Sequence, residues 1–318
     1  MSDPVIPTPD ADARLAQADA LHDDEPPRAL ELLRSLDVAA LSTGRLGRLS
    51  FLLDHVTGEK FGLWDEALAG QQAVVRQAGA QVTPLILRHA AIAAHVAGDE
   101  SLERDWTQAL AASADAPLAK ARTLVALGAL QFAVSRLPAE TAGRRVLHAL
   151  QPLGELHESP GTGLDAAFGA ITNNIASELV ERPLDDLAQP DLREALARCA
   201  DHARRFWQAA GTWVNRERAH YLCAMAANAL GHGDEGAAHA RAGLALLDEF
   251  DADAGENVDR AFLELEFAAS LRLAGQPGRP EALARALALA SRFGEPWLDR
   301  WFSDRQTRNE ALAERYGR

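Results

Sequence analysis

Residues 62–68 read Gly62-Leu63-Trp64-Asp65-Glu66-Ala67-Leu68, and this stretch decides the fold. A glycine suits a tight turn, and the two acidic residues that follow suit the first turn of a helix. A second copy, Gly231-His232-Gly233-Asp234-Glu235-Gly236-Ala237-Ala238, lies much later in the chain. Each copy stands between two stretches rich in Ala and Leu. A turn that recurs between helical stretches indicates helical hairpins that stack on one another.

The same alternation of helical stretches and breakers extends over most of the chain. Apolar residues recur at helical spacing, and we find no run of Val and Ile that would predict a strand. The expected fold class is therefore all-α. The pattern predicts about seven antiparallel hairpins and a last helix. These cover residues 10–36, 42–78, 84–112, 117–156, 164–210, 213–250 and 258–293, and then 296–315.

The breakers also predict the domain organisation. Residues 1–9 are polar and rich in proline, and we expect them to be disordered. Residues 10–318 are expected to form a single α-helical repeat domain. The run Ser159-Pro160-Gly161-Thr162-Gly163 is the strongest breaker, so a subdomain seam is predicted at 157–163.

The turn segments resemble tetratricopeptide repeats. Gly62, Trp64, Asp65, Glu66 and Ala67 match that family's Gly-x-aromatic-Asp-Glu-Ala turn, and Gly233, Asp234, Ala238 and Ala245 fit the same pattern. The resemblance implies a right-handed α-solenoid that binds a peptide or partner protein in its concave groove. The hairpins recur unevenly, at roughly 40 residues, whereas tetratricopeptide repeats have about 34 and HEAT or armadillo repeats about 40–47. We therefore expect irregular repeats, with helix 296–315 as the C-terminal cap of the array.

The charge balance limits the partners. The net charge is −14, from 32 Lys and Arg against 46 Asp and Glu, which disfavours nucleic acid and anionic membranes. No apolar run reaches the roughly 18 residues of a membrane span, and the N-terminus lacks the features of a signal peptide. Two cysteines without metal or redox spacing fit a reducing compartment, so a cytoplasmic location is expected.

No motif in the sequence indicates catalysis, a cofactor or a metal. The histidine pairs lack a third ligand at suitable spacing. Paired acids such as Asp23-Asp24 lie at turns and helix starts, where we interpret them as partners of free backbone N–H groups. The sequence therefore predicts a protein that is not an enzyme and binds no cofactor.

One pattern indicates a binding face. Cationic and apolar residues recur at i, i+4 and i+7 on the first helices of several hairpins, as Arg48, Leu52 and His55, again as Arg88, Ile92 and His95, and in part as Arg216 and His220. The amides of Gln131, Asn173 and Asn174 lie on intervening first helices. An Arg offers a fork of donors for carboxylates. These residues are the candidate peptide-binding site, although ordinary solvated or ion-paired helix positions would give the same pattern.

Two functions follow from these observations. The first is a non-enzymatic scaffold that binds a peptide or partner protein through the candidate residues. The alternative is a sensory or regulatory module that binds a small signal molecule or peptide and acts on a separate output protein. An enzyme of the α/α-toroid type would need clustered acids at inward-facing helix ends, and the spacing of the acids does not provide them.

Overall fold

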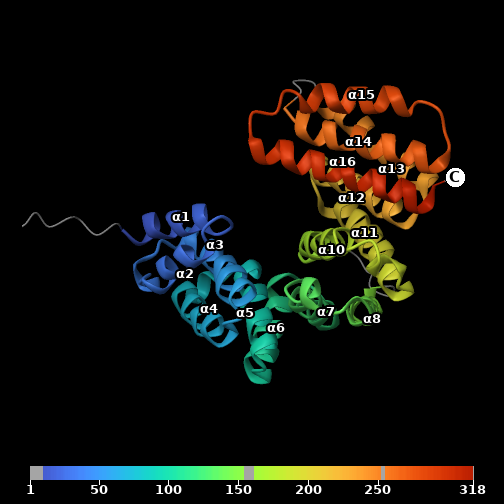
Figure 1. Ribbon diagram of the computed structural model, residues 1–318. Helices are drawn as coiled ribbons and strands as arrows, with labels where there is room; N and C mark the ends of the chain where they lie inside the picture. Colours follow the sequence, from blue (N-terminus) through green and yellow to red (C-terminus); the bar gives the residue numbers. More distant parts are fainter. Residues whose placement is uncertain (1–9, 154–160, 252–254, 318) are drawn as a thin grey trace, which may run out of the picture. The chain divides into compact units, whose positions relative to one another are not determined.

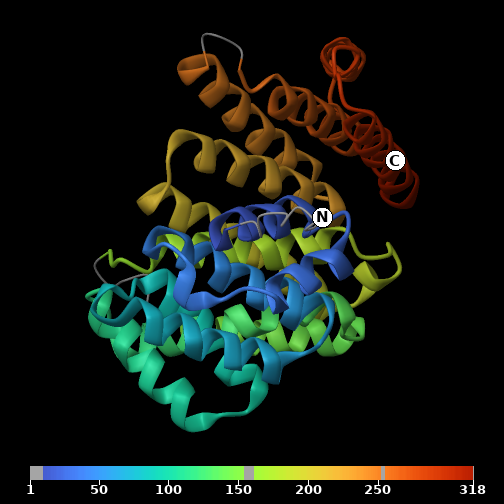
Figure 2. The same ribbon diagram turned by 90° about the vertical axis from the view of Figure 1, so that its left-hand side faces the viewer.

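The computed structural model describes residues 10–153, 161–251 and 255–317, and every regular element within these ranges is a helix (Figures 1 and 2). The all-α prediction is confirmed. None of the described helices is long and apolar enough to cross a membrane.

The α-helices are α1 Ala11–Leu21, α2 Pro26–Arg34, α3 Leu46–Leu52, α4 Trp64–Ala78, α5 Pro84–Ala97, α6 Glu100–Ser113, α7 Leu118–Gln131, α8 Ala139–Leu150, α10 Asp165–Val180, α11 Pro190–Ala210, α12 Trp213–Leu230, α13 Gly233–Phe250, α14 Asn257–Ala274, α15 Arg279–Ala290 and α16 Pro296–Tyr316. A π-helical segment, η3, covers Leu53–Lys60, and the short 3-10 turns are η1 Val38–Ala40, η2 Thr43–Arg45, η4 Gly79–Gln81, η5 Val134–Arg136 and η6 Asp186–Ala188.

The ends of these helices follow from local chemistry. Asp10 caps α1, and its carboxylate accepts a hydrogen bond of 2.9 Å from the backbone N–H of Ala13. Gly98, Gly231 and Gly275 end α5, α12 and α14 in the left-handed conformation, with φ of 79°, 80° and 65°. Residues with a side chain rarely adopt that conformation, so glycine marks these ends in the sequence.

The described chain divides into two compact units. Unit 1 comprises Met1–Ala133 with Thr162–Leu164, and unit 2 comprises Val134–Gly161 with Asp165–Arg318. The predicted hairpin over 117–156 is therefore wrong, because α7 packs against α5 and α6 in unit 1, whereas α8 packs against α11 in unit 2. The predicted seam at 157–163 falls largely on residues outside the described ranges, as does the predicted disorder of residues 1–9.

Unit 1 pairs α1 with α2, α4 with η3 and α3, and α5 with α6. An apolar stripe of α3 and η3 faces the core, where Leu46, Leu49, Leu52 and Val56 are buried. Gly58 lies inside the π-helical η3. A Cβ at this position would lie 2.6 Å from the ring of Trp64, so the glycine lets that ring pack directly on the backbone.

Unit 2 pairs α10 with α11, α12 with α13 and α14 with α15. Small residues bring α13 close to its neighbours: a Cβ on Gly233 would lie 2.4 Å from the backbone nitrogen of Ala274. Ala237 is buried, whereas Ala238 is exposed. The sequence-based choice of Ala238 as the small contact residue is thus wrong by one position, because the glycines of this turn also contribute to the contact face.

We call the first helix of each pair a leading helix. In unit 1 the leading helices α3, α5 and α7 contact one another in succession, and in unit 2 α10, α12 and α14 do so. Helix α16 is not paired with a second helix; it lies on the leading helices, mainly α14 and also α12 (Figure 1). We call the side of α10, α12 and α14 that carries α16 the leading-helix face of unit 2.

Helix α16 presents a regular stripe to this face. Its buried residues include Leu298, Phe302, Arg305, Asn309 and Leu312, which alternate in steps of four and three. This spacing keeps one side of a helix against its neighbours. Trp297 and Trp301, beside this stripe, are 53% and 44% exposed, and Trp301 packs on Phe262 of α14 with ring centroids 4.3 Å apart.

Candidate functional site

The contact between α16 and unit 2 centres on a buried ion pair. Glu266 of α14 is 0% exposed and Arg305 of α16 is 2% exposed, and Arg305 Nε donates to Glu266 Oε1 over 2.6 Å. Asn309 donates to the same oxygen over 2.9 Å, and Asn228 of α12 donates to Glu266 Oε2 over 2.8 Å. Buried charges need such partners. The polar centre of the stripe therefore fixes where α16 sits along the leading helices.

Further contacts extend across the whole leading-helix face. Arg308 donates to the carbonyl of Val180, the last residue of α10, and to that of Arg182 over 2.7 Å. At the C-terminal end of α16, the hydroxyl of Tyr316 donates to the carbonyl of Ala229 in α12 over 3.0 Å. Helix α16 thus touches α10, α12 and α14, and unit 2 holds a helix on its leading helices.

The predicted residues of unit 2 lie on these leading helices but do not form one cluster. Asn173 and Asn174 lie on α10, half-buried and exposed respectively, and their side chains contact each other at 3.5 Å. Arg216 of α12 is half-buried, and its Nε is buried without a hydrogen-bond partner. His220, also on α12, places Nδ1 3.1 Å from Nδ1 of His239.

The pair of His220 and His239 resists protonation. Burial, and then the neighbouring His239, lower the pKa of His220 to about 4. Burial also lowers the pKa of His239. A ring nitrogen that carries a proton on one side of the 3.1 Å contact must face a free lone pair on the other, so a second proton is disfavoured.

In unit 1 the structure brings Arg48 and His55 together around Phe51, a residue that sequence reasoning did not select. The guanidinium of Arg48 lies 4.4 Å from the centre of the Phe51 ring and is ion-paired with Asp19. The ring of His55 stacks on Phe51 with centroids 5.3 Å apart. Cation, aromatic ring and imidazole thus form one continuous surface across α3 and η3.

The second predicted triplet, Arg88, Ile92 and His95 on α5, does not share one exposed face. Arg88 is half-buried, with Nη2 3.3 Å from His89 Nε2 and with Nε buried without a partner. His95 is exposed and contacts Glu103 at 2.9 Å. Ile92 is only 2% exposed, which corrects its assignment to a binding face, because α5 packs against α4, α6 and α7 and this position faces the core. Gln131 is half-buried at the end of α7.

A buried polar network lies next to Phe51, whose ring centroid is 6.0 Å from that of His89. His89 Nδ1 donates to Asp54 Oδ2 over 2.8 Å, and Gln71 donates to Asp54 Oδ1 over 2.7 Å. Ser50 in turn donates to Gln71 over 2.7 Å. Burial raises the pKa of Asp54 and lowers the pKa of His89. The network is missed by sequence reasoning because its members come from four helical segments, α3, η3, α4 and α5, and each alone is a common helix residue.

Three residues at the rim of unit 1 could hold a metal. The ligand atoms of His22, Asp23 and His55 all lie within 4.8 Å of one another, and this is the one such group found among the described residues. The sequence-based interpretation of Asp23 as a helix cap is wrong, because α2 has no side-chain cap and Asp23 contacts Lys60 at 2.8 Å instead. The hydrogen bond from Lys60 is the main reason that the pKa of Asp23 is lowered.

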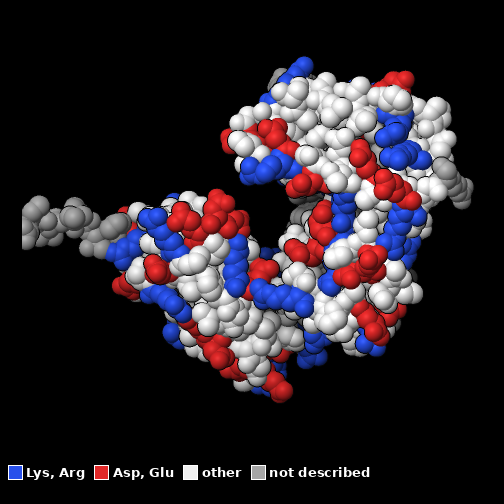
Figure 3. Space-filling view, in the orientation of Figure 1, with Lys and Arg blue, Asp and Glu red and all other residues white. Residues whose placement is uncertain are grey.

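The distribution of surface charge does not single out a further binding site. On the face drawn in Figure 3, acidic and basic side chains are interspersed over both units. Comparison with known proteins gave no match, either to a family model or to a curated protein. Function is therefore argued from the geometry of the two units.

Proposed function

We propose that the chain is a non-enzymatic helical scaffold, an irregular tetratricopeptide-like solenoid that binds a segment of a partner protein on its leading helices. One observation carries the proposal: α16 lies across α10, α12 and α14 and is held there by the buried pair of Glu266 and Arg305. A succession of leading helices in this chain therefore already binds a helix, supplied by the chain itself.

We assign the partner's binding surface to unit 1, on α3, η3 and α5. Its centre is Phe51, flanked by Arg48 and His55, and the neighbouring helix α5 adds the guanidinium group of Arg88. In the described part of unit 1, α1 to α6 form the pairs and α7 packs against α5 and α6, and none of these helices lies across the succession as α16 does in unit 2. Two guanidinium groups and an aromatic ring suit a segment with acidic and apolar side chains.

Selection of peptides from a random display library against the full chain tests this assignment. We expect enriched peptides to carry Asp or Glu beside an apolar residue. Arg88→Gln should weaken their binding by about tenfold, the scale of one charge-assisted hydrogen bond. Arg76→Glu is the matched control, since Arg76 is exposed on α4 and not on a leading helix. Equal binding by the wild type and by Arg48→Gln/Arg88→Gln would exclude this surface.

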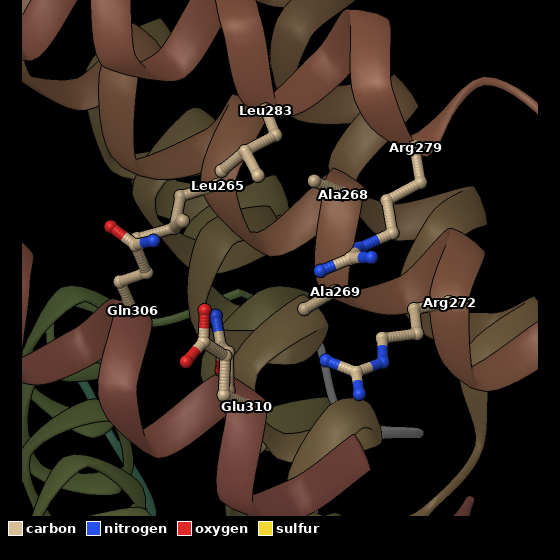
Figure 4. Close-up of a pocket in the computed structure, with 9 residues that line it drawn as sticks. Leu265, Ala268, Ala269, Arg272, Arg279, Leu283, Gln306 and Glu310 are labelled. Carbon is tan, nitrogen blue, oxygen red and sulfur yellow. The ribbon is translucent and has the colours of Figure 1, made fainter.

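The alternative, a module that binds a small signal molecule, has its own support in unit 2. A pocket between α14, α15 and α16 is lined by Arg272 and Arg279, whose guanidinium groups both point into it (Figure 4). No side-chain partner is described for either arginine. Glu310 and the unpartnered Oδ1 of Asn309 also line the pocket, and these acceptors suit a hydroxyl or ammonium group on the same small molecule. Two free guanidinium groups suit a small carboxylate.

A thermal-shift screen with small carboxylates tests this second function. A ligand of this pocket should raise the melting temperature of the wild type, and the rise should vanish in Arg272→Gln/Arg279→Gln. Arg292→Gln is the control, because Arg292 is exposed and lies outside the pocket. A rise that survives the double change would place the ligand elsewhere.

A further inference from the structure

Two histidines and one aspartate converge where α1 ends and η3 passes. His22 directly follows α1, Asp23 is the next residue, and His55 lies in η3. Asp23 Oδ2 is 3.2 Å from His22 Nε2, and Asp23 Oδ1 is 3.4 Å from His55 Nε2. In a tetrahedral site with metal–ligand bonds of about 2.0–2.1 Å, neighbouring ligand atoms lie about 3.3 Å apart. Each distance is close to this spacing, with each histidine facing a different oxygen of Asp23.

The other nitrogen of each imidazole is already held. His22 Nδ1 is 2.5 Å from the backbone carbonyl of Asp19, and His55 Nδ1 is 2.6 Å from Glu59 Oε2. Both partners only accept, so each Nδ1 carries the hydrogen. In the neutral ring this leaves the lone pair on Nε2. Histidines that bind metal are oriented in the same way, by a carbonyl or carboxylate at the far nitrogen.

With these tautomers the cluster contains only hydrogen-bond acceptors at its centre. Two Nε2 lone pairs face the carboxylate of Asp23, and acceptors that face each other repel unless a cation lies between them. Lys60 supplies a cation to Asp23 Oδ1 only, so between the carboxylate and the two Nε2 atoms the cation is either a proton on each ring or one metal ion. We propose that His22, Asp23 and His55 form a binding site for one divalent first-row transition metal ion. Zn²⁺ suits the ligand set best.

The type of ion follows from the ligands. Imidazole nitrogen with one carboxylate suits Zn²⁺, Co²⁺, Ni²⁺ and Cu²⁺, whereas Ca²⁺ and Mg²⁺ take oxygen ligands. Three protein ligands leave a fourth position for water or for a group from outside. The ion would tie the connection between α1 and α2 to η3, and thus link the first two helix pairs of unit 1.

The π-helical form of η3 contributes a competitor for this ion. Its i→i+5 hydrogen-bond pattern sets residues five apart nearly above one another, so Lys60 shares the side of His55. Lys60 Nζ lies 2.8 Å from Asp23 Oδ1. Metal binding must therefore displace the ammonium group from one carboxylate oxygen, which is feasible because the Asp23 side chain is 66% exposed.

Titration of the full, untagged chain with ZnCl₂ by calorimetry tests the proposal, together with the visible absorption of bound Co²⁺. We expect one ion per chain and a Co²⁺ spectrum typical of low coordination number. His22→Gln and His55→Gln should each weaken binding by more than about 100-fold. Glu59→Gln should weaken it by about 10–100-fold, the usual effect of losing the group that orients a ligand.

His95→Gln is the matched control. His95 also contacts a glutamate, Glu103, at 2.9 Å, but it belongs to no group of three ligands. Its replacement should leave Zn²⁺ affinity unchanged. Far-UV circular dichroism of each variant verifies that the helices persist. Absence of saturable one-to-one binding by the folded wild type overturns the proposal, and so does binding that survives the His22→Gln/His55→Gln double change. Because His55 also borders the partner surface, peptide binding is judged on Arg48→Gln/Arg88→Gln alone, and the Zn²⁺ titration of the wild type leaves that test unaffected.

Discussion

The leading helices of the two units differ in how their charges are paired. In unit 2 the central charge, Glu266, is fully buried, and its partner Arg305 comes from α16, a helix that lies across the face. In unit 1 Arg48 is paired with Asp19, and Lys60 with Asp23, through groups that are partly exposed. In unit 2 the succession of leading helices is thus covered by a helix of the same chain, which supplies the partner of the buried charge. In unit 1 the charges pair with residues of neighbouring elements at the surface.

This difference teaches which contacts set stability and which are available for binding. A buried charge that loses its partner costs several kcal/mol, whereas an exposed pair contributes little. Unit 2 therefore depends on its bound helix. The exposed pairs of unit 1 can exchange partners at little cost, as a surface that binds and releases must.

The largest effect is expected from Arg305→Met, which leaves Glu266 buried and charged. We expect a loss of about 3–5 kcal/mol in the unfolding free energy of unit 2. Urea unfolding, with hydrogen exchange of α14 as the readout for unit 2, measures it. Glu266→Gln/Arg305→Met removes both charges and should recover part of the loss. Arg315→Met, at an exposed position of the same helix, should cost less than about 1 kcal/mol. Equal losses at 305 and 315 would contradict the comparison.

A second test asks whether α16 is bound as a ligand would be. A protease site placed at Gly294, which lies between α15 and α16, allows the connection to be cut after folding. A Cβ at this glycine would meet no atom within 4 Å, so the insertion disturbs little. We expect the cut C-terminal fragment to co-elute with the rest of the chain in gel filtration, and to separate from it in Arg305→Met. Arg315→Met is the control, since Arg315 pairs with the exposed Asp185 and the carbonyl of Leu184. Release of the fragment from this variant as well would show that Arg305 does not hold the helix.

The histidines give a pH-dependent contrast. In unit 1 His55 faces acids, whereas in unit 2 His220 faces His239. The folded pKa of His220, about 4, lies below the unfolded value near 6.5, so the unfolded chain binds more protons in between. Stability is therefore full above about pH 6.5 and is lost as the pH falls toward 4. His220→Gln should reduce the acid-induced drop in the melting temperature of unit 2 between pH 7 and pH 5. An unchanged slope would contradict the role of this pair.

The sequence predicts the helices of this fold well, for a physical reason. Glycine at the left-handed helix ends and proline or acid at the starts act within a few residues, so Gly98, Gly231 and Gly275 mark boundaries directly. The unit boundary could not be read in this way. Whether α8 packs on α7 or on α11 depends on contacts between distant residues, which spacing along the chain does not record.

The candidate site in unit 1 could likewise be predicted only where its residues are near one another in the sequence. Arg48 and His55 could be chosen from i and i+7 spacing within one helix. Phe51, three residues after Arg48, has helical spacing too and could have been chosen in the same way. Asp19 and His22 could not, because they reach Arg48 and His55 from about 30 positions away, and η3 departs from the α-helical period on which such reasoning depends. Ile92 has the spacing of the predicted binding face but is buried, since burial is set by the helices packed around α5.

The smallest effect is expected from Lys60→Met, which sharpens the comparison at the rim of unit 1. Lys60 is to Asp23 what Arg305 is to Glu266, a cation supplied by the chain, but Asp23 is 66% exposed. An exposed pair of this kind contributes roughly 0–1 kcal/mol, so its removal should leave stability almost unchanged. The same removal frees one oxygen of Asp23 and takes away a positive charge beside the proposed ion. Zn²⁺ affinity should therefore rise, by up to about fivefold. Calorimetry of this variant beside Arg76→Met, on the exposed side of α4, separates the local effect from a general change in net charge. A fall in affinity would mean that Lys60 holds Asp23 in place for the metal and does not compete with it.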